Sequence, residues 1–395
     1  MIRRRPLTAL ALALGMALPA AAAAEPVFSF TGRGWGHGVG MSQYGARGAA
    51  LAGLGAAEIL AHYYRGTELT TIPEGAVRVL LRSRQRQISV TSANPWQAVD
   101  ETADPPRAVP LRARLTYTVR PDGAGGVVVQ GPRGGTVARM PGQMRFQSLQ
   151  PTSTIALGRA RYRGAMRIVP AARTVSAVNV VDIEQYLYGV VPREMPASWG
   201  NRTPAALEAQ AIAARTYAVA TMRQEEDYDL MADTRSQVYG GVGGEDRRST
   251  AAVDATRGQV VTYQGEIVTT YYFSTSGGRT EDVQNVFSGS EPAPYLVGVE
   301  DPWDQASPYH ARWPEAKVFS ASRLGRLLGA GAPVARIDNI VRGASPRVVS
   351  ARVVTRGGRA VTLSGARIRT ALGLRDTWFF VTRRAGAAAA SRPSR

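Results

Sequence analysis

Short apolar runs dominate the chain between residues 76 and 181, and clusters of Gly and Pro separate them. Residues 77–81, 115–119 and 127–129 are examples, and each is rich in Val, Leu or Tyr. Runs of this length, bounded by turn-forming residues, are typical of β-strands. We therefore expect residues 76–180 to form a β-rich module.

A helical pattern replaces the strand pattern in residues 204–222. Thr203 can cap a helix with its hydroxyl, and Pro204 fits the first helical position. Leu207 and Ala211 begin an apolar spacing that continues around most of the helix, so we expect the helix to be buried. Together with the strands, it predicts an α+β fold with a central buried helix.

This helix carries Arg215, and a buried guanidinium needs a partner because an unpaired buried charge is very costly. Glu194 is the nearest plausible carboxylate outside the helix, and Glu208 is the competing candidate within it.

Glu194 itself stands between Pro192 and Pro196 in the sequence Pro-Arg-Glu-Met-Pro. Proline fixes its own φ angle and restricts the residue before it, so the backbone that presents Glu194 has little freedom. A rigidly presented acid suits catalysis, but a structural carboxylate that binds Arg215 fits the same residues equally well.

The N-terminus has the pattern of a secretory signal peptide. Three arginines precede an apolar stretch at residues 7–18 and an Ala-rich end, which predicts a signal peptide over residues 1–24. No later apolar run approaches the roughly 18 residues needed to span a bilayer, so we expect no stable membrane anchor. The expected location is exported, in a periplasm or in the extracellular cell wall.

Composition changes the expected partners. The formal net charge is +18, and about +15 remains without Arg3, Arg4 and Arg5. For an exported chain this charge favours anionic polymers of the cell envelope over nucleic acid. A solvated arginine-rich surface is the alternative. With no cysteine, disulfides and thiolate metal sites are excluded.

A glycine-dense block, Gly-Arg-Gly-Trp-Gly-His-Gly-Val-Gly-Met-Ser-Gln-Tyr-Gly, occupies residues 32–45, and residues 46–64 have helical spacing. The spacing does not match a dinucleotide-binding or phosphate-binding loop. His37 either lines a ligand groove or is a structural residue among glycine backbone groups. No second metal ligand follows His37 at suitable spacing, so metal binding is not expected.

The sequence after residue 265 predicts short elements. A predicted strand at residues 266–273 runs into the loop Ser-Thr-Ser-Gly-Gly at residues 274–278, which faces a ligand or forms an ordinary turn. A short helix at residues 368–372 and a strand at residues 378–381 follow. We expect residues 384–395 to be a disordered tail.

Five ordered blocks resemble the SpoIID/LytB family. They are Tyr-Leu-Tyr-Gly-Val-Val-Pro-Arg-Glu-Met-Pro at 186–196, Glu-Ala-Gln-Ala-Ile-Ala-Ala-Arg-Thr-Tyr at 208–217, Ser-Gln-Val-Tyr at 236–239, Ser-Thr-Ser-Gly-Gly at 274–278 and Leu-Ser-Gly-Ala-Arg-Ile-Arg at 363–369. The resemblance covers residues 76–381 and implies a SpoIID-like catalytic core at residues 181–383.

The glycine block is similar to a segment that the family usually carries at its C-terminal end. Its place near the N-terminus resembles a circular permutation, which is tolerated when the chain ends lie close together. We therefore expect residues 25–70 to pack on the core, with residues 28–45 beside the strand at 378–381.

The resemblance implies that the substrate is peptidoglycan. Glu194 matches the catalytic glutamate of the family, Arg215 matches its helix arginine, and Gln237 and Tyr239 match groove-lining positions. Other substrate-binding candidates are Ser274, Ser276, His37, Gln43 and Tyr44. Some family members hold zinc through cysteine and histidine. Because this chain lacks cysteine, no metal and no cofactor are expected.

Two activities remain open. Members of the family resemble lytic transglycosylases, in which the C6 hydroxyl of muramic acid attacks the anomeric carbon and one carboxyl serves as acid and then base. That role needs desolvation to keep Glu194 protonated, so Arg215 should not bind it in a close bidentate bond. Other members enhance an N-acetylmuramoyl-L-alanine amidase without turnover. A serine hydrolase is a distant third reading, since no spacing supports a triad.

Overall fold

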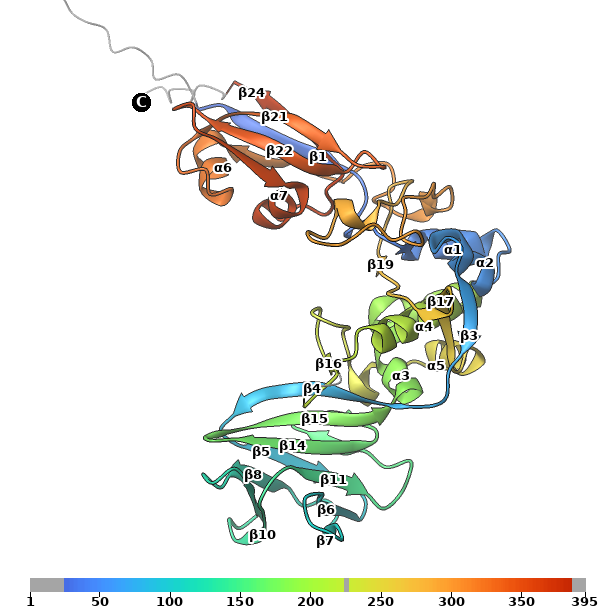
Figure 1. Ribbon diagram of the computed structural model, residues 1–395, viewed down its shortest axis with the longest axis vertical. Helices are drawn as coiled ribbons and strands as arrows, with labels where there is room; N and C mark the ends of the chain where they lie inside the picture. The colour runs from blue at the N-terminus through green and yellow to red at the C-terminus, as the bar shows by residue number, and fades with distance from the viewer. Residues whose placement is uncertain (1–24, 224–226, 386–395) are drawn as a thin grey trace, which may run out of the picture.

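The computed structural model describes residues 25–223 and 227–385. The chain forms a β-rich part, a helical centre and a C-terminal part, which follow one another along a curve (Figure 1). The combination of sheets and helices makes the fold α+β. The predicted signal peptide, and the predicted tail beyond residue 385, lie outside the described residues.

Two sheets make up most of the β-rich part, and both are antiparallel except where β16 pairs parallel with β4. One has the strand order β16-β4-β15-β14-β11-β6-β7 and the other β10-β9-β8-β5-β12-β13. Alternate residues of the strands point into a shared core, where the rings of Trp96 and Phe146 lie 5.3 Å apart. The strands are β4 (Ala76–Gln85), β5 (Ile88–Ser92), β6 (Trp96–Asp100), β7 (Arg107–Leu111), β8 (Tyr117–Pro121), β9 (Val127–Gln130), β10 (Thr136–Met140), β11 (Met144–Ser148), β12 (Ile155–Leu157), β13 (Ala160–Tyr162), β14 (Ala165–Ala171), β15 (Thr174–Asp182) and β16 (Leu230–Met231).

The helical centre surrounds α4 (Pro204–Ala220), which is the buried helix expected from the sequence. Eleven of its 17 residues are buried. Most of them are alanines, and their small side chains let neighbouring helices approach closely. The other elements are β2 (Met41–Ser42), α1 (Gln43–Leu51), α2 (Ala56–Tyr63), β3 (Glu68–Thr71), α3 (Ile183–Glu194), η1 (Ala197–Asn201), η2 (Gly241–Gly244), α5 (Arg247–Ala255), β17 (Gln259–Tyr263), β18 (Glu266–Ile267), β19 (Tyr272–Phe273), η3 (Val283–Asn285) and η4 (Asp304–Ala306).

The C-terminal part has a core of its own and joins both ends of the described chain. Its sheets have the strand orders β20-β1-β24 and β21-β22-β23. The rings of Phe30 and Phe379 lie 5.6 Å apart between them. The elements are β1 (Val27–Gly32), β20 (Lys317–Ser320), α6 (Ala321–Leu327), β21 (Val334–Arg342), β22 (Val348–Thr355), β23 (Ala360–Ser364), α7 (Gly365–Leu372) and β24 (Phe379–Arg384).

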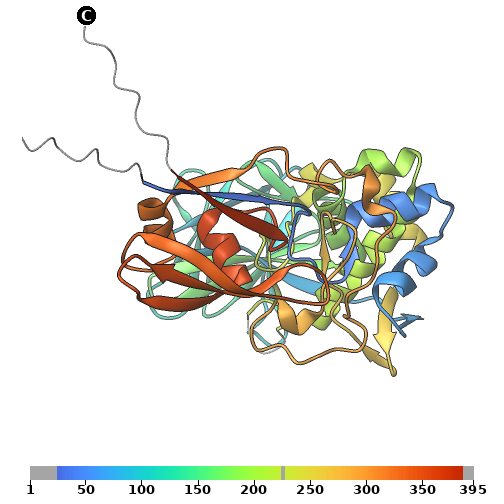
Figure 2. The same ribbon diagram turned by 90° about the horizontal axis from the view of Figure 1, so that it is seen from above.

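The strand that precedes the glycine block lies beside the last strand of the chain. β1 pairs antiparallel with β24, with Phe30 opposite Val381 and Gly32 opposite Phe379. Both ribbon views show the two strands side by side (Figures 1 and 2). The contact expected between these segments is therefore present for residues 28–32. Whether their order is permuted relative to the family stays a prediction.

Two predicted elements are broken in the structure. Residues 46–64 form parts of two helices, α1 and α2, because Gly53 adopts a φ of 96° between them. Residues 266–273 form only the short strands β18 and β19. Within residues 25–223 and 227–385, none of the helices combines the length and the apolar character that crossing a membrane requires.

Candidate functional site

Glu194 is the last residue of α3 and is positioned by both ends of that helix. Asp182 caps the N-terminus, where its Oδ1 accepts hydrogen bonds from the backbone N–H groups of Glu184 and Gln185 at 3.0 and 3.2 Å. At the C-terminus, Met195 turns into extended backbone and its side chain is fully buried. The helix therefore stops at Glu194, and the buried neighbour fixes the carboxyl in place.

The Glu194 carboxyl lines a pocket of about 300 Å³ at the helical centre. Side chains from α3, α4, the glycine block, the loop after β16, the start of β19 and the segment after η3 surround it. The lining residues are His37, Glu194, Tyr217, Thr234, Ser236, Val238, Tyr271, Tyr272 and Phe287. Glu194 is the one carboxylate in this lining, and aromatic rings form much of the remaining wall.

The environment of Glu194 favours its protonated form. The carboxyl is half-buried, and burial raises its pKa above the ordinary 4.5. One hydrogen bond opposes this effect, because the backbone N–H of Val238 donates to Oε1 at 3.3 Å. Among the described residues, no cation forms an ion pair with Glu194. A carboxyl in this setting can donate a proton closer to neutral pH than an exposed one.

His37 lies in the same pocket but has no free ring nitrogen. The backbone N–H of Val39 donates to Nδ1 at 3.2 Å, so Nε2 carries the proton and donates to the carbonyl of Tyr272 at 3.0 Å. Burial lowers the pKa of His37 to about 4. His37 is therefore neutral and contributes its ring, packed against Phe273 and Phe287, to the pocket wall.

Arg215 does not face the pocket, which corrects its assignment as a substrate-binding residue. Its Nε and Nη2 donate to Oε1 and Oε2 of Glu184 at 2.9 and 2.5 Å. Both side chains are buried. The partner is thus neither Glu194 nor Glu208, because Glu184 lies on the first turn of α3 and faces α4 directly. The absence of a close bond between Arg215 and Glu194 agrees with the requirement for a protonated acid.

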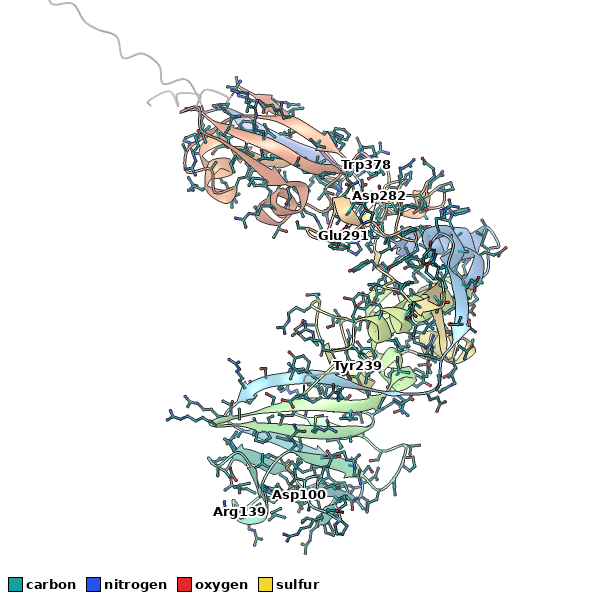
Figure 3. The ribbon with its side chains drawn as sticks, viewed as in Figure 1. Asp100, Arg139, Tyr239, Asp282, Glu291 and Trp378 are labelled. Atoms are coloured by element: carbon teal, nitrogen blue, oxygen red, sulfur yellow. The ribbon has the colours of Figure 1, made fainter. Side chains whose placement is uncertain are left out.

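Gln237 and Tyr239 are also buried, so the structure does not support their expected place in the groove lining. Gln237 Nε2 donates to the hydroxyl of Tyr272 at 2.9 Å, and the Tyr239 hydroxyl donates to Asn179. Figure 3 places Tyr239 where the helical centre meets the β-rich part. Ser236 and Val238 line the pocket instead. Alternate side chains of this segment point to opposite sides, and Gln237 and Tyr239 point into the interior.

Four other candidates lie outside the pocket lining. Ser276 is fully buried and its hydroxyl accepts from the N–H of Gly278, while the Ser274 hydroxyl is within 3.3 Å of Thr275 Oγ1. Gln43 is buried and donates to Gln210 at 3.2 Å. The Tyr44 ring packs edge-on against Trp199, with ring centroids 4.9 Å apart. These residues support the elements around the site.

Most of the pocket wall consists of residues that the sequence pattern did not single out. The missed residues are Tyr217, Thr234, Ser236, Val238, Tyr271, Tyr272 and Phe287. Tyr217 lies two residues after Arg215 in the same sequence block, and two residues correspond to about 200° around the helix axis, so the two side chains point to opposite sides of α4. Tyr271 and Tyr272 are adjacent in a segment that was expected to be a regular strand. Phe287 and Thr234 carried no sequence signal.

A buried acidic pair lies between the glycine block and the loop after β19. Asp304 accepts hydrogen bonds from Ser42 Oγ at 3.0 Å and from Gly277 N at 2.9 Å. Asp301 is fully buried, and neither of its oxygens has a partner with hydrogen-bond geometry among the described residues. Burial and the neighbouring Asp304 raise the pKa of Asp301 to about 6. Within the described residues, no cluster of three or more His, Cys, Asp or Glu could hold a metal ion.

Comparison with known proteins gives one family. The family model described as SpoIID, Stage II sporulation protein, matches residues 171–263. The Stage II sporulation protein D of Bacillus amyloliquefaciens is 30% identical over 275 residues, which cover 65% of this chain and 76% of that protein. Its counterpart in Bacillus subtilis is 33% identical over 229 residues, 53% of this chain and 64% of that protein.

A relative with a different name matches a shorter segment. The Amidase enhancer of Bacillus subtilis is 40% identical over 118 residues, which cover 30% of this chain and 15% of that protein. The matched region therefore spans less than two thirds of the Amidase enhancer and of the Bacillus subtilis sporulation protein.

Proposed function

Because the chain belongs to the SpoIID/LytB family, we propose that it acts on the glycan strands of peptidoglycan as a lytic transglycosylase. Glu194 is the proposed catalytic residue. The observation that carries this proposal is a single carboxylate with a raised pKa, in a pocket whose other walls are largely aromatic. The proposed location is outside the cytoplasmic membrane, in a periplasm or a cell wall, where this polymer lies.

A single carboxyl is sufficient for this reaction. In hydrolysis, two carboxylates normally flank the glycosidic bond so that water can be activated or a covalent intermediate can form. In the proposed reaction, the substrate supplies its own nucleophile, the C6 hydroxyl of the muramic acid residue. Since the pocket lining contains no second carboxylate, its composition suits the intramolecular reaction better.

Glu194 acts twice in the proposed mechanism. In its protonated form it donates a proton to the glycosidic oxygen as the bond to the anomeric carbon breaks. The resulting carboxylate removes the proton from the C6 hydroxyl as that oxygen bonds to the anomeric carbon, which leaves a 1,6-anhydro end and restores the acid. The Val238 N–H, 3.3 Å from Oε1, stabilises the carboxylate between the two steps.

The aromatic wall fits a sugar substrate. Tyr217, Tyr271, Tyr272 and Phe287 present rings and hydroxyls around the carboxyl. Aromatic faces pack against the apolar faces of sugar rings, while phenolic hydroxyls bind sugar hydroxyls. His37 adds a neutral ring to the same wall and does not take part in proton transfer, because both of its nitrogens are bound to backbone groups.

The Glu194→Gln variant tests the mechanism. Wild-type protein incubated alone with purified sacculi should release products with 1,6-anhydro ends, detected by mass spectrometry, and Glu194→Gln should release none. Glu208→Gln is a matched control, since Glu208 lies on α4 outside the pocket lining. Release of anhydro products by Glu194→Gln would overturn the assignment.

A second function is favoured by one relative. The match to a protein named Amidase enhancer supports a role in which this chain holds glycan and activates a cell-wall amidase without turnover. In that case the protein alone yields no anhydro ends, and the amidase cleaves faster in its presence. An amidase assay with Glu194→Gln separates the two, because an enhancer should keep its effect in that variant.

A further inference from the structure

The loop after α7 holds an arginine between two aromatic rings. The guanidinium carbon of Arg375 lies 4.8 Å from the ring centroid of Trp35 and 4.7 Å from that of Tyr309. The two rings meet edge to face, with centroids 4.8 Å apart. Stacking on both rings restricts the side chain, because the cation is attracted to the face of each ring. Trp35 is 40% exposed, so part of its surface is open.

The hydrogen-bond donors of this guanidinium are unused. In the described part of the chain, no carboxylate forms an ion pair with Arg375, and its side chain donates no hydrogen bond to protein. The adjacent acid, Asp376, is fully engaged by Arg347, whose Nε and Nη2 donate to it at 2.9 and 3.0 Å. Arg375 therefore presents a fixed planar cation without a counterion.

The backbone around Arg375 is held by the glycine block. The carbonyl of Arg375 accepts hydrogen bonds from Gly36 N at 3.1 Å and from Arg369 Nε at 3.2 Å. Trp35 exchanges two backbone hydrogen bonds with Thr275, at 2.9 and 3.0 Å. Both halves of the stack are thus fixed before any ligand arrives, which reduces the entropy lost on binding.

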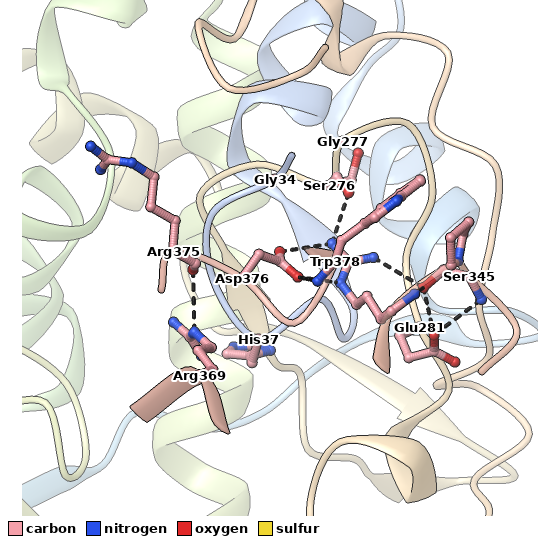
Figure 4. A network of polar contacts seen from close by, with 12 residues as sticks. Gly34, His37, Ser276, Gly277, Glu281, Ser345, Arg369, Arg375, Asp376 and Trp378 are labelled. Carbon is pink, nitrogen blue, oxygen red and sulfur yellow. Dashed lines mark hydrogen bonds and ion pairs between the residues drawn. The ribbon is translucent and has the colours of Figure 1, made fainter. Parts of the chain in front are cut away.

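This stack lies next to the Glu194 pocket. Trp35 precedes His37 by two residues, so their Cα atoms are at most about 7 Å apart, and His37 lines the pocket. Figure 4 shows Arg369 close to His37, and the Arg375 side chain extending away from the Asp376–Arg347 network, on the side opposite Glu281. The cation is therefore placed at the border of the proposed active site.

We propose that Arg375 and Trp35 form a subsite that binds a carboxylate-bearing sugar of the substrate strand. The planar fork of Arg375 matches a carboxylate in bidentate geometry, and the open face of Trp35 packs against the sugar ring that carries it. The inference rests on the proposed glycan substrate. Two sources of the carboxylate share this chemistry, the lactyl group of a muramic acid without peptide and the acidic groups of an attached peptide.

Binding measurements with Arg375→Gln test the subsite. The Glu194→Gln protein serves as the parent, so that ligands are not consumed, and soluble glycan oligomers are titrated with and without peptides. We expect Arg375→Gln to weaken binding about tenfold to hundredfold, the range for a lost charged hydrogen-bonding pair. Arg384→Gln is the control, since it removes the same charge from an exposed position at the end of β24.

Comparing oligomers with and without peptides shows whether the carboxylate that binds Arg375 belongs to the sugar or to the peptide. Weaker binding of the peptide-free oligomer assigns the carboxylate to the sugar, and an effect confined to the peptide-bearing oligomer assigns it to the peptide. Peptide-free oligomers with amidated lactyl groups should bind both proteins equally if the sugar carboxylate is the ligand. An effect no larger than that of Arg384→Gln, or an equal effect on a glycerol-phosphate polymer, overturns the subsite.

Two further variants and one assay keep the test independent of folding and of the reaction. Arg375→Lys keeps the charge but loses the planar fork, and Trp35→Ala removes both the proposed sugar contact and one of the two rings that hold Arg375. Each should weaken binding, and thermal unfolding reports whether each variant folds. Cleavage by the wild-type protein is measured separately. Subsite binding without cleavage would leave the subsite intact and remove only the transglycosylase proposal.

Discussion

The guanidinium of Arg215 binds both carboxylate oxygens of Glu184, at 2.9 and 2.5 Å, in the interior of the helical centre. The same carboxylate accepts from the backbone N–H of Gly258, and Arg215 Nη1 donates to the carbonyl of Gln259. The ion pair thus joins α3, α4 and the start of β17. These contacts assign Arg215 to the stability of the core around Glu194.

Arg215→Met should therefore unfold more easily. The substitution leaves the Glu184 carboxylate buried without its cation, which typically costs about 3–5 kcal/mol. Urea unfolding should show a loss of that size, and the folded fraction should keep its glycan affinity. Glu208→Gln, on the same helix, should change stability little. A stable Arg215→Met protein with lost glycan affinity would return Arg215 to the binding site.

Activity should depend on the protonation of Glu194. Burial raises the pKa of this carboxyl above 4.5, so its acid form persists to higher pH than that of an exposed glutamate. The initial rate of anhydro-product release should therefore fall as the pH rises through this raised pKa. Rates measured from pH 4 to pH 8 provide the test, and a loss of activity centred at or below 4.5 would contradict it.

Asp301 should make the protein less stable as the pH rises. Its pKa is raised from 3.8 to about 6 in the folded state, so the folded protein binds the proton more tightly than the unfolded chain. The stabilising effect of that proton is complete below about pH 4 and is lost as the pH rises through 6. The shift corresponds to roughly 3 kcal/mol.

Asp301→Asn removes this dependence because the amide stays neutral. Its free energy of unfolding, measured between pH 4 and pH 8, should change less with pH than that of the wild type, with the largest gain above pH 6. Glu291→Gln is the control, because Glu291 is exposed (Figure 3) and should leave the profile unchanged. Parallel profiles for Asp301→Asn and the wild type would refute the assignment.

Gly38→Ala should damage the contact between the glycine block and the C-terminal part. Gly38 has a φ of 91°, and an added Cβ would lie 2.3 Å from Nε of Arg347. The substitution therefore adds backbone strain and displaces the buried partner of Asp376. Gly53→Ala is a matched control, since Gly53 has a φ of 96° but no atom within 4 Å of an added Cβ.

The difference between the two variants isolates the packing effect. Strain alone should cost about 1–2 kcal/mol in each, and Gly38→Ala should lose at least about 2 kcal/mol more because it disrupts a buried ion pair. Equal losses in thermal or urea unfolding would show that Arg347 moves aside without cost.

Local sequence signals were sufficient for α4 and for the strand-rich character of residues 76–180, but not for the breaks at residues 46–64 and 266–273 or for which side chains face the pocket. Pro204 predicted where α4 begins, because a proline at the first helical position depends on neighbouring residues only. The expected cap by Thr203 is wrong, since its hydroxyl donates to the carbonyl of Trp199 instead. The rigid presentation of Glu194 stays a prediction. The partner of Arg215 depends on how α3 crosses α4, and the inward side of Gln237 depends on a segment without regular strand pairing. Contacts between segments that are far apart in the chain leave no periodic pattern in the sequence.

Because β1 pairs with β20 and β24, the sheet that contains it can form only after most of the chain has been synthesised. β1 is the first strand in the described chain, yet its partners contain residues 317–320 and 379–384. Until those residues have left the ribosome, both edges of β1 have no partner, and the glycine block that follows it cannot take its final position. The wall that carries His37 and Trp35 is therefore completed last, so a partly synthesised chain cannot bind its ligand in the manner proposed above.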